Sequence, residues 1–259
     1  MPRTFFGERP ILVATVLLTA ILLTAGGCGS KEAGNLLVLC GKSFRLPMEA
    51  LVKQYEEQTG SQVDLSFGGC EDLFPHVKFQ SQGDLYVAHD PFIEDTKSAG
   101  SLLRSVAVGE MVPVLVVKKG NPLKIERIED LARPGVRVVL PDPQYATAGQ
   151  MVVEVLKKKG IYEAVMKNVE NALVRSHSEV AELVRLGHRE AGMMWNGVAR
   201  AGEWSKDLDV VPTPGEYPKP VQVAVMGLSY SKRPNQVEEF LKFTETRGRK
   251  VFAESGYVK

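Results

Sequence analysis

The sequence lacks the residue patterns that mark metal centres and several common catalytic sites. Its four histidines do not recur at a metal-binding spacing, and Cys40 and Cys70 belong to no C-x-x-C pair. A G-x-S-x-G nucleophile elbow and a phosphate-binding P-loop are also missing. Within a ligand cleft, only His177 and Cys70 are candidates for a catalytic base or nucleophile. We therefore expect no metal cation, no cofactor and no enzymatic activity.

Neither sign of charge is in excess. The 259 residues include 32 Lys and Arg and 31 Asp and Glu, which gives a formal net charge of +1. Removal of residues 1–27, which contain Arg3, Glu8 and Arg9, leaves 232 residues with 30 basic and 30 acidic side chains. Proteins that bind nucleic acid usually carry a basic excess, so we expect no such partner. The remaining length is enough for one large domain or two domains of about 100 residues.

A long apolar run occurs near the amino terminus. Arg3 and Arg9 precede the apolar residues 11–23, and Ala25-Gly26-Gly27-Cys28 follows them. This order is typical of a secretory signal peptide, and the run is short for a hydrocarbon core of roughly 30 Å. The small residues before Cys28 resemble a bacterial lipobox, which predicts a signal peptide over 1–27, lipidation of Cys28 and a flexible tether over 28–34. The alternative is an uncleaved membrane anchor with an incidental cysteine.

The remaining cysteines form an even pair once Cys28 is assigned to a lipid. Exported proteins fold in an oxidising compartment, where a Cys40–Cys70 disulfide is one interpretation of this pair. Two buried free thiols are the other interpretation.

Strand-like and helix-like segments alternate along the chain. Apolar or alternating runs predict strands over residues 36–39, 63–67 and 84–88, and helical spacing predicts helices over 46–58 and 71–80. A second unit of similar size has predicted strands over 136–140, 172–175 and 191–195, with helices over 147–159 and 178–186. This order predicts an α/β fold in which parallel strands are flanked by helices.

Three further segments complete the pattern. Pro113 lies within the apolar run 111–117, which favours an edge or crossing strand over a central one. Residues 221–226 are predicted as a returning strand, and residues 236–244 and 247–253 as helical, with Gly248 tolerated between them.

Polar or glycine-rich loops lie between four predicted strands and the helices that follow them. The loops are Cys40-Gly41-Lys42-Ser43, Gly68-Gly69-Cys70, Thr147-Ala148-Gly149 and Ser176-His177-Ser178. The first turn of a helix has free backbone N–H groups and a partial positive charge, and such ends bind anions. A serine or glycine there is often an ordinary cap. Four such loops, two in each half, predict an anion site at the carboxyl ends of the strands.

Other polar and aromatic residues have plainer interpretations. Glu71 and Asp72 are interpreted as a solvated helix face rather than a catalytic pair. Trp195 ends a predicted strand just before Asn196 and Gly197, where it either belongs to the core or lines a pocket.

The order of these segments resembles a known family. The segments are Leu39-Cys40-Gly41-Lys42-Ser43, Ser66-Phe67-Gly68-Gly69-Cys70, residues 83–90, Pro141-Asp142-Pro143 with Thr147-Ala148-Gly149, Ala191-Gly192-Met193-Met194-Trp195 and residues 248–257. Through them the chain, from about Leu36 to Val258, resembles the periplasmic solute-binding proteins of ABC importers with a type II fold. The resemblance is closest to the molybdate- and tungstate-binding family.

The resemblance implies a two-lobed periplasmic-binding-protein fold. Each lobe would be a mixed, mostly parallel sheet flanked by helices, with the ligand cleft between the lobes. The first lobe would comprise residues 35–112 and 221–259, and the second residues 113–220. The crossing strands near 111–114 and 220–223 would form the hinge.

The resemblance also implies which residues bind the anion. The family's serine after the first strand matches Ser43, and the backbone N–H that it uses in the third loop matches Ala148. The residue of the fourth loop matches His177 or a neighbour.

Three positions depart from the family pattern. The second serine falls on Gly69 or Cys70, so its hydroxyl is missing, and the tyrosine of the last strand falls on Trp195. Lys42 adds a charge to a site that is neutral in the family. The loss of a hydroxyl costs about 1–3 kcal/mol where its partner stays buried and unpaired. An organic anion that pairs with Lys42 and stacks on Trp195 is therefore an alternative ligand.

These expectations combine into one functional hypothesis. We expect an exported lipoprotein, anchored to a membrane through Cys28 and facing the periplasm or the cell exterior. It would bind a small oxyanion, molybdate or tungstate first, and deliver it as a monomer to an ABC permease. The alternatives are a receptor for an organic or other inorganic anion with a transport or sensing role, and an enzyme of the same fold.

Overall fold

The computed structural model of the protein describes residues 34–200, 202 and 204–257. The predicted signal peptide, Cys28 and nearly all of the predicted tether lie outside the described residues. Among the residues that are described, no helix is both long enough and apolar enough to cross a membrane.

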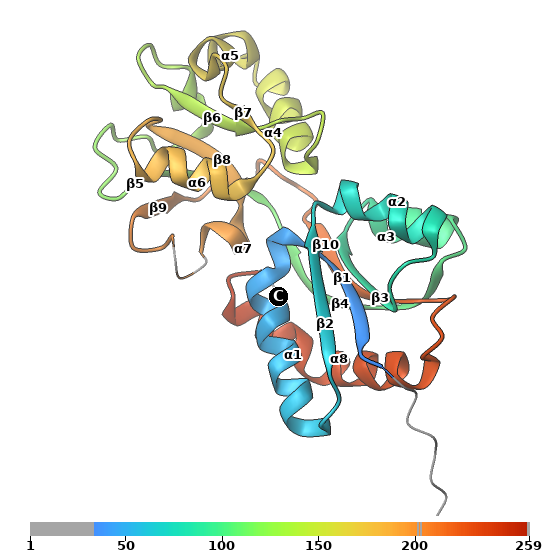
Figure 1. The fold of residues 1–259 in the computed structure, drawn as a ribbon. Helices are drawn as coiled ribbons and strands as arrows, with labels where there is room; N and C mark the ends of the chain where they lie inside the picture. Colours follow the sequence, from blue (N-terminus) through green and yellow to red (C-terminus); the bar gives the residue numbers. More distant parts are fainter. Residues whose placement is uncertain (1–33, 201, 203, 258–259) are drawn as a thin grey trace, which may run out of the picture. The chain divides into compact units, whose positions relative to one another are not determined.

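The first sheet joins strands from the amino-terminal part of the chain to one strand from its carboxyl-terminal part (Figure 1). Its strands are β1 (Leu36–Gly41), β2 (Val63–Gly68), β3 (Leu85–His89), β4 (Leu102–Met111) and β10 (Val221–Leu228). Their order is β2-β1-β3-β10-β4, with β1 parallel to β2 and β3 and with β10 antiparallel to β3 and β4. We call this sheet and its helices the first lobe.

Helices pack on this sheet through their apolar faces. They are α1 (Arg45–Thr59), α2 (Cys70–Gln80), α3 (Phe92–Ser98) and α8 (Pro234–Glu254), with a short 3₁₀ turn at Lys42–Phe44. Helix α1 ends where Gly60 adopts a left-handed conformation, with φ of 70°. The ring of Tyr55 packs edge-on against Phe240 and Phe243 at centroid distances of 4.9 and 5.4 Å, which joins α1 to α8.

The second sheet is built from the middle of the chain. Its strands are β5 (Pro113–Lys118), β6 (Val138–Pro141), β7 (Leu173–Val174), β8 (Ala191–Trp195) and β9 (Leu208–Val211). The order is β7-β6-β8-β5-β9, with β6 parallel to β7 and β8 and with β5 antiparallel to β8 and β9. The helical elements are α4 (Thr147–Lys158), α5 (Tyr162–Val169), α6 (His177–Arg185), α7 (Asn196–Ala199) and a 3₁₀ helix at Ile128–Ala132. We call this group the second lobe.

The structure rules out an edge position for the strand at Pro113, although the chain does cross from the first sheet to the second at residues 111–113. Strand β5 lies inside its sheet, between β8 and β9, although it contains Pro113. The proline is tolerated because it is the first residue of the strand and pairs only with Trp195, while pairing with β9 begins at Leu115. The two segments predicted as helical near the carboxyl terminus form one helix, α8. Gly248 lies within it, and a Cβ at this position would lie 2.8 Å from Cγ1 of Val108. Glycine therefore permits close packing of α8 on β4.

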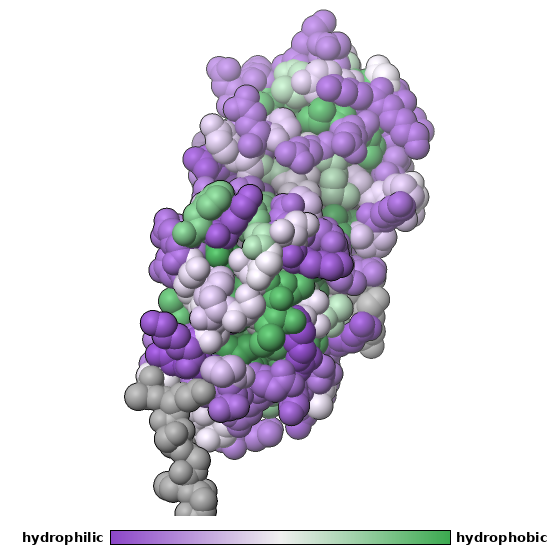
Figure 2. All heavy atoms as spheres, turned by 90° about the vertical axis from the view of Figure 1, so that its right-hand side faces the viewer, coloured by the Kyte–Doolittle hydropathy of each residue, from purple (hydrophilic) through white to green (hydrophobic). Residues whose placement is uncertain are grey.

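Figure 2 shows one face of the molecule, on which hydrophobic areas are interrupted by polar side chains. The exposed large hydrophobic side chains are scattered over different elements: Leu46, Phe79, Leu103, Leu123, Tyr145 and Leu186.

Candidate functional site: helix N-termini and aromatic rings between the lobes

Three aromatic rings from the two lobes, those of His89, His177 and Trp195, lie close together. Trp195 is the last residue of β8 and is 2% exposed. Its ring centroid lies 5.7 Å from that of His89, the last residue of β3, and 5.9 Å from that of His177, the first residue of α6. Trp195 also belongs to the hydrophobic cluster of the first lobe. Trp195, which we expected either in the core or at a pocket, therefore joins the two lobes and lies beside His177.

His89 is a member of this group that we did not predict. Its Nδ1 lies 2.6 Å from the carbonyl oxygen of Asp90, and burial lowers its pKa to about 4. The ring is therefore neutral at neutral pH, and donation from Nδ1 leaves Nε2 as an acceptor. The signal was present in the sequence, because His89 follows a predicted strand as directly as the four loops do.

His177 presents an unsatisfied polar atom. Its Nδ1 is buried and has no hydrogen-bond partner among the described residues. Burial, together with the smaller effect of the neighbouring His89, lowers the pKa of His177 to about 3. A buried polar atom without a partner is costly in a folded protein, which makes this nitrogen a candidate contact point for a ligand.

Cys70 packs against the end of β1. A Cβ added to Gly41 would lie 2.6 Å from Sγ of Cys70 and 2.9 Å from the ring of Phe44, so a side chain at position 41 has no room. The hydroxyl of Tyr86 donates to the carbonyl oxygen of Cys70 over 2.9 Å. Cys70 therefore lies at the carboxyl ends of the central strands, as predicted for a site residue.

Cys40 and Cys70 are both free and buried, so the predicted disulfide is not formed and the second interpretation holds. Successive residues of a strand point to opposite faces. Since Cys70 lies on the side to which a Cβ of Gly41 would point, the preceding Cys40 is directed away from it. Burial raises the pKa of both thiols, which keeps them protonated.

Ser43 and Lys42 differ in their surroundings. The hydroxyl of Tyr257 donates to the carbonyl oxygen of Ser43, which ties this loop to the end of the chain. Ser43 is half-buried, whereas the side chain of Lys42 is exposed. The structure thus ties Ser43 to Tyr257 and leaves the side chain of Lys42 exposed.

The four predicted helix starts are not equivalent. Helix α6 is capped by its own residues, because Oγ of Ser176 accepts the backbone N–H of Glu179 over 3.2 Å. The start after β1 is only a 3₁₀ turn of three residues. In contrast, α2 begins after Gly69 and α4 after Ala146, and neither helix has a side-chain cap. Of these four starts, the α-helices that begin without an N-cap side chain are therefore α2 and α4.

The start of α4 is held tightly. Ala148 is fully buried in the cluster of the first lobe, although α4 belongs to the second. A Cβ added to Gly149 would lie 2.8 Å from the backbone nitrogen of Pro143, so glycine lets the preceding loop fold onto the helix. The first turn of α4 is thus fixed at the boundary between the lobes.

The predicted solvated face Glu71-Asp72 is wrong for Glu71. Asp72 is exposed and pairs with Arg175 of the second lobe at 3.4 Å, while the Arg175 guanidinium lies 4.2 Å from the ring centroid of Tyr145. Glu71 is half-buried, and burial raises its pKa. Hydrogen bonding to its own backbone N–H and to that of Thr147, the first residue of α4, opposes this effect and lowers the pKa. A carboxylate of the first lobe therefore contacts the uncapped start of α4.

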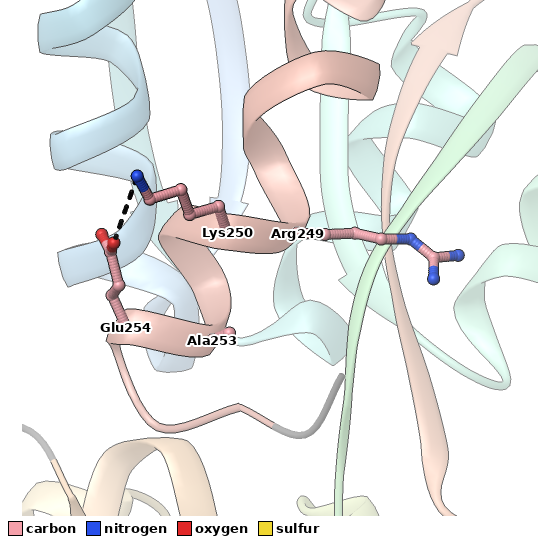
Figure 3. Close-up of a pocket in the computed structure, with 4 residues that line it drawn as sticks. All are labelled: Arg249, Lys250, Ala253 and Glu254. Atoms are coloured by element: carbon pink, nitrogen blue, oxygen red, sulfur yellow. Dashed lines mark ion pairs between the residues drawn. The ribbon is translucent and has the colours of Figure 1, made fainter.

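A hollow elsewhere does not have the features of a ligand site. Its described lining comes from α8 alone: Arg249, Lys250, Ala253 and Glu254. Figure 3 shows Lys250 and Glu254 paired along the helix, at 3.9 Å, while Arg249 points away from them. No cluster of three or more histidine, cysteine or acidic side chains with metal-binding geometry occurs in the described part of the chain.

Comparison with known proteins identifies the family. Residues 36–258 match the model of the bacterial extracellular solute-binding proteins. The chain belongs to this family. It is similar to the molybdate-binding protein ModA of Mycobacterium tuberculosis, at 25% identity over 97% of this chain and 99% of the relative. The family and its relatives are binding proteins of transporters rather than enzymes.

Solved structures of similar proteins share the fold. The periplasmic molybdate-binding protein of Azotobacter vinelandii has a TM-score of 0.69 at 21% identity, covering 87% of this chain and 99% of that one. The sulfate-binding protein SubI of M. tuberculosis has a TM-score of 0.69 at 19% identity, covering 87% and 86%. These likenesses confirm the predicted two-lobed α/β fold. The chain is thus an exported solute-binding protein of an ABC transporter.

Proposed function

We propose that this solute-binding protein takes up a small oxyanion, with molybdate or tungstate as the first candidates. The observation that carries the proposal is the uncapped starts of α2 and α4, which come from different lobes and lie together at the cleft. The N–H groups of these first turns, two of which interact with the Glu71 carboxylate, would supply donors and partial positive charge without a buried cation. The unsatisfied Nδ1 of His177 marks the same region.

Lobe closure is the proposed mechanism of capture. The lobes are connected by the passage from β4 to β5 at Met111–Pro113 and by the chain between β9 and β10, and these passages would act as the hinge. Closure would desolvate the anion between α2 and α4, where hydrogen bonds are stronger than in water.

The geometry of the donors would determine which oxyanion is bound. Gly69 and Cys70 offer backbone N–H groups where the family resemblance implies a serine hydroxyl. Trp195 stands where the resemblance implies a tyrosine. The relatives themselves are named for molybdate and for sulfate. A small organic anion remains the second candidate, favoured by the rings of His89, His177 and Trp195 that surround the cleft.

Isothermal titration of the purified protein against molybdate, tungstate, sulfate, phosphate and small carboxylates tests this proposal. We expect saturable heat with at least one tetrahedral oxyanion. The His177→Ala variant should weaken binding, whereas His188→Ala, which changes an exposed histidine beyond α6, should not. Absence of heat and of any thermal shift with the whole panel would refute the oxyanion proposal.

We also propose that the mature protein begins at a lipidated Cys28 and acts as a monomer that delivers its ligand to a membrane permease. The tether would raise the local concentration of the receptor at the permease. Mass spectrometry of the mature protein from membranes should show an acylated amino-terminal cysteine. A Cys28→Ala variant recovered with the same mass modification and membrane fraction would contradict this.

A further inference from the structure

Glu71 occupies the place at which the two uncapped helices meet. It lies in the first turn of α2, and a Cβ added to Gly69 would lie 3.3 Å from Oε2 of Glu71. The carboxylate is therefore folded back over the amino-terminal end of its own helix. The backbone N–H groups that stabilise its charge belong to Glu71 itself and to Thr147 at the start of α4.

The contact between the lobes is supported by a neighbouring ion pair. Asp72, the next residue of α2, pairs at 3.4 Å with Arg175, which follows β7 in the second lobe. The start of α2 thus faces the second lobe through two successive carboxylates. Only Glu71 is turned toward donors that an incoming anion would use, because Asp72 is exposed and engaged with Arg175.

We propose that Glu71 acts as a built-in anion that an oxyanion ligand must displace or neutralise, so that the complex contains one proton shared between the Glu71 carboxyl and the bound oxyanion. The inference rests on the proposed oxyanion function and concerns the regulation and selectivity of that site. A ligand that is fully ionised takes this proton from solvent. A ligand that still has a proton at neutral pH, such as phosphate, brings it along.

The physical reason is repulsion between like charges in a partly desolvated place. A carboxylate and an oxyanion that use the same N–H groups cannot both stay fully ionised without a large cost, and one proton removes it. The pair then titrates as a unit, and the proton belongs to the pair rather than to either group. Burial already raises the pKa of Glu71 before any ligand is bound, which favours proton uptake there.

Charged groups from both lobes act on Glu71. Asp72 on the same helix raises the pKa of Glu71, and Arg175 of the second lobe lowers it. The thiol of Cys70 and the hydroxyl of Tyr86 are its other titratable neighbours, and burial keeps both protonated by raising their pKa. Neither of these two groups changes charge near neutral pH.

The histidines of the cleft are the competing proton acceptors. Burial lowers the pKa of His89 to about 4 and that of His177 to about 3, so both are neutral in the free protein. A bound anion would favour their protonated forms as well. The experiment must therefore separate Glu71 from the histidines.

Titration calorimetry of the full mature protein with molybdate, tungstate, sulfate and phosphate at pH 6, 7 and 8 tests the inference. Each titration is repeated in two buffers of different ionisation enthalpy, which gives the number of protons taken up. For a fully ionised anion we expect close to one proton, and an affinity that rises up to tenfold per pH unit as the pH falls. For Glu71→Gln we expect tighter binding at pH 8 and a proton number near zero.

Matched variants decide between the possible proton acceptors. Asp72→Asn removes an equal charge from the adjacent position and should leave the proton number unchanged. His89→Asn and His177→Asn should also leave it unchanged, whatever they do to affinity. If the proton number stays near one in Glu71→Gln, or disappears in a histidine variant, the inference is overturned. Binding without proton uptake by the parent protein overturns the inference alone, whereas absence of binding to all four anions overturns the proposed function.

Discussion

A single added methyl group at Gly197 tests the contact that joins the second lobe to the end of the chain. Gly197 lies in α7, directly after Trp195 and Asn196. A Cβ at this position would lie 2.5 and 2.7 Å from two ring carbons of Tyr257, distances that no relaxed structure allows. The Gly197→Ala variant must therefore displace Tyr257, which is 5% exposed, or move α7.

The sign of the effect on stability distinguishes this contact from ordinary helix propensity. Alanine is favoured over glycine in a helix by up to about 1 kcal/mol. Overpacking of a close contact costs typically about 1–3 kcal/mol. We therefore expect Gly197→Ala to lower the free energy of unfolding by about 1–2 kcal/mol. Because the Tyr257 hydroxyl donates to the Ser43 carbonyl, the variant should also weaken oxyanion binding.

Urea unfolding followed by the fluorescence of Trp195 and Trp204 measures the effect. Gly202→Ala is the matched control, since no atom lies within 4 Å of a Cβ at Gly202, and it should be neutral or slightly stabilising. In a Tyr257→Ala background, Gly197→Ala should cost nothing further. A Gly197→Ala protein that is as stable as the parent would show that the contact with Tyr257 does not constrain the fold.

Three other predictions concern buried groups. The carboxylate of Asp84 accepts hydrogen bonds from the Leu37 N–H at 2.9 Å, the Ser231 hydroxyl at 2.6 Å and the Arg233 guanidinium at 3.3 Å. In urea unfolding, Asp84→Ala should therefore lower the free energy of unfolding by about 3–5 kcal/mol, and Asp64→Ala, at an exposed position, by less than about 1 kcal/mol. Equal losses would disprove the role of this network. In a Cys28→Ser protein, a thiol reagent should label Cys40 and Cys70 only after unfolding, because both are free and buried; no labelling after unfolding would mean that they are bonded. Burial lowers the pKa of His89 to about 4 and that of His177 to about 3, so the unfolded chain binds protons first, and the free energy of unfolding should fall as the pH decreases from about 6.5 towards 4. The urea midpoint of His177→Gln should fall less steeply over this range than the midpoints of the parent and of His188→Gln. Equal slopes would contradict the assignment to His177.

Local patterns in the sequence predicted most of the secondary structure. Helices α1, α2, α4 and α6 begin within one residue of the predicted positions, because their apolar spacing and terminal glycines are local signals. Two exceptions have a common reason. Pro113 and Gly248 look unfavourable by local rules, yet their neighbours in the fold, Trp195 and Val108, determine what each position tolerates.

The candidate site was predicted only in part. The strand-end rule located Ser43, Cys70, Ala148, His177 and Trp195, since each of these positions follows or ends a strand. It missed His89, although the same rule applied to it. It also could not show that Ser176 caps α6 while α2 and α4 remain uncapped, because capping depends on side-chain geometry.

The sequence by itself determined the alternation of strands and helices and the positions of the loops that follow the strands, because periodicity and turn residues act over a few neighbours. The tertiary structure alone decided that Glu71 meets the start of α4 and that His89, His177 and Trp195 form one group. Glu71 and Thr147 are more than 70 positions apart in the chain, and His89 and Trp195 are more than 100 apart. Such contacts depend on how two sheets are placed against each other, and no local signal in the sequence specifies that placement.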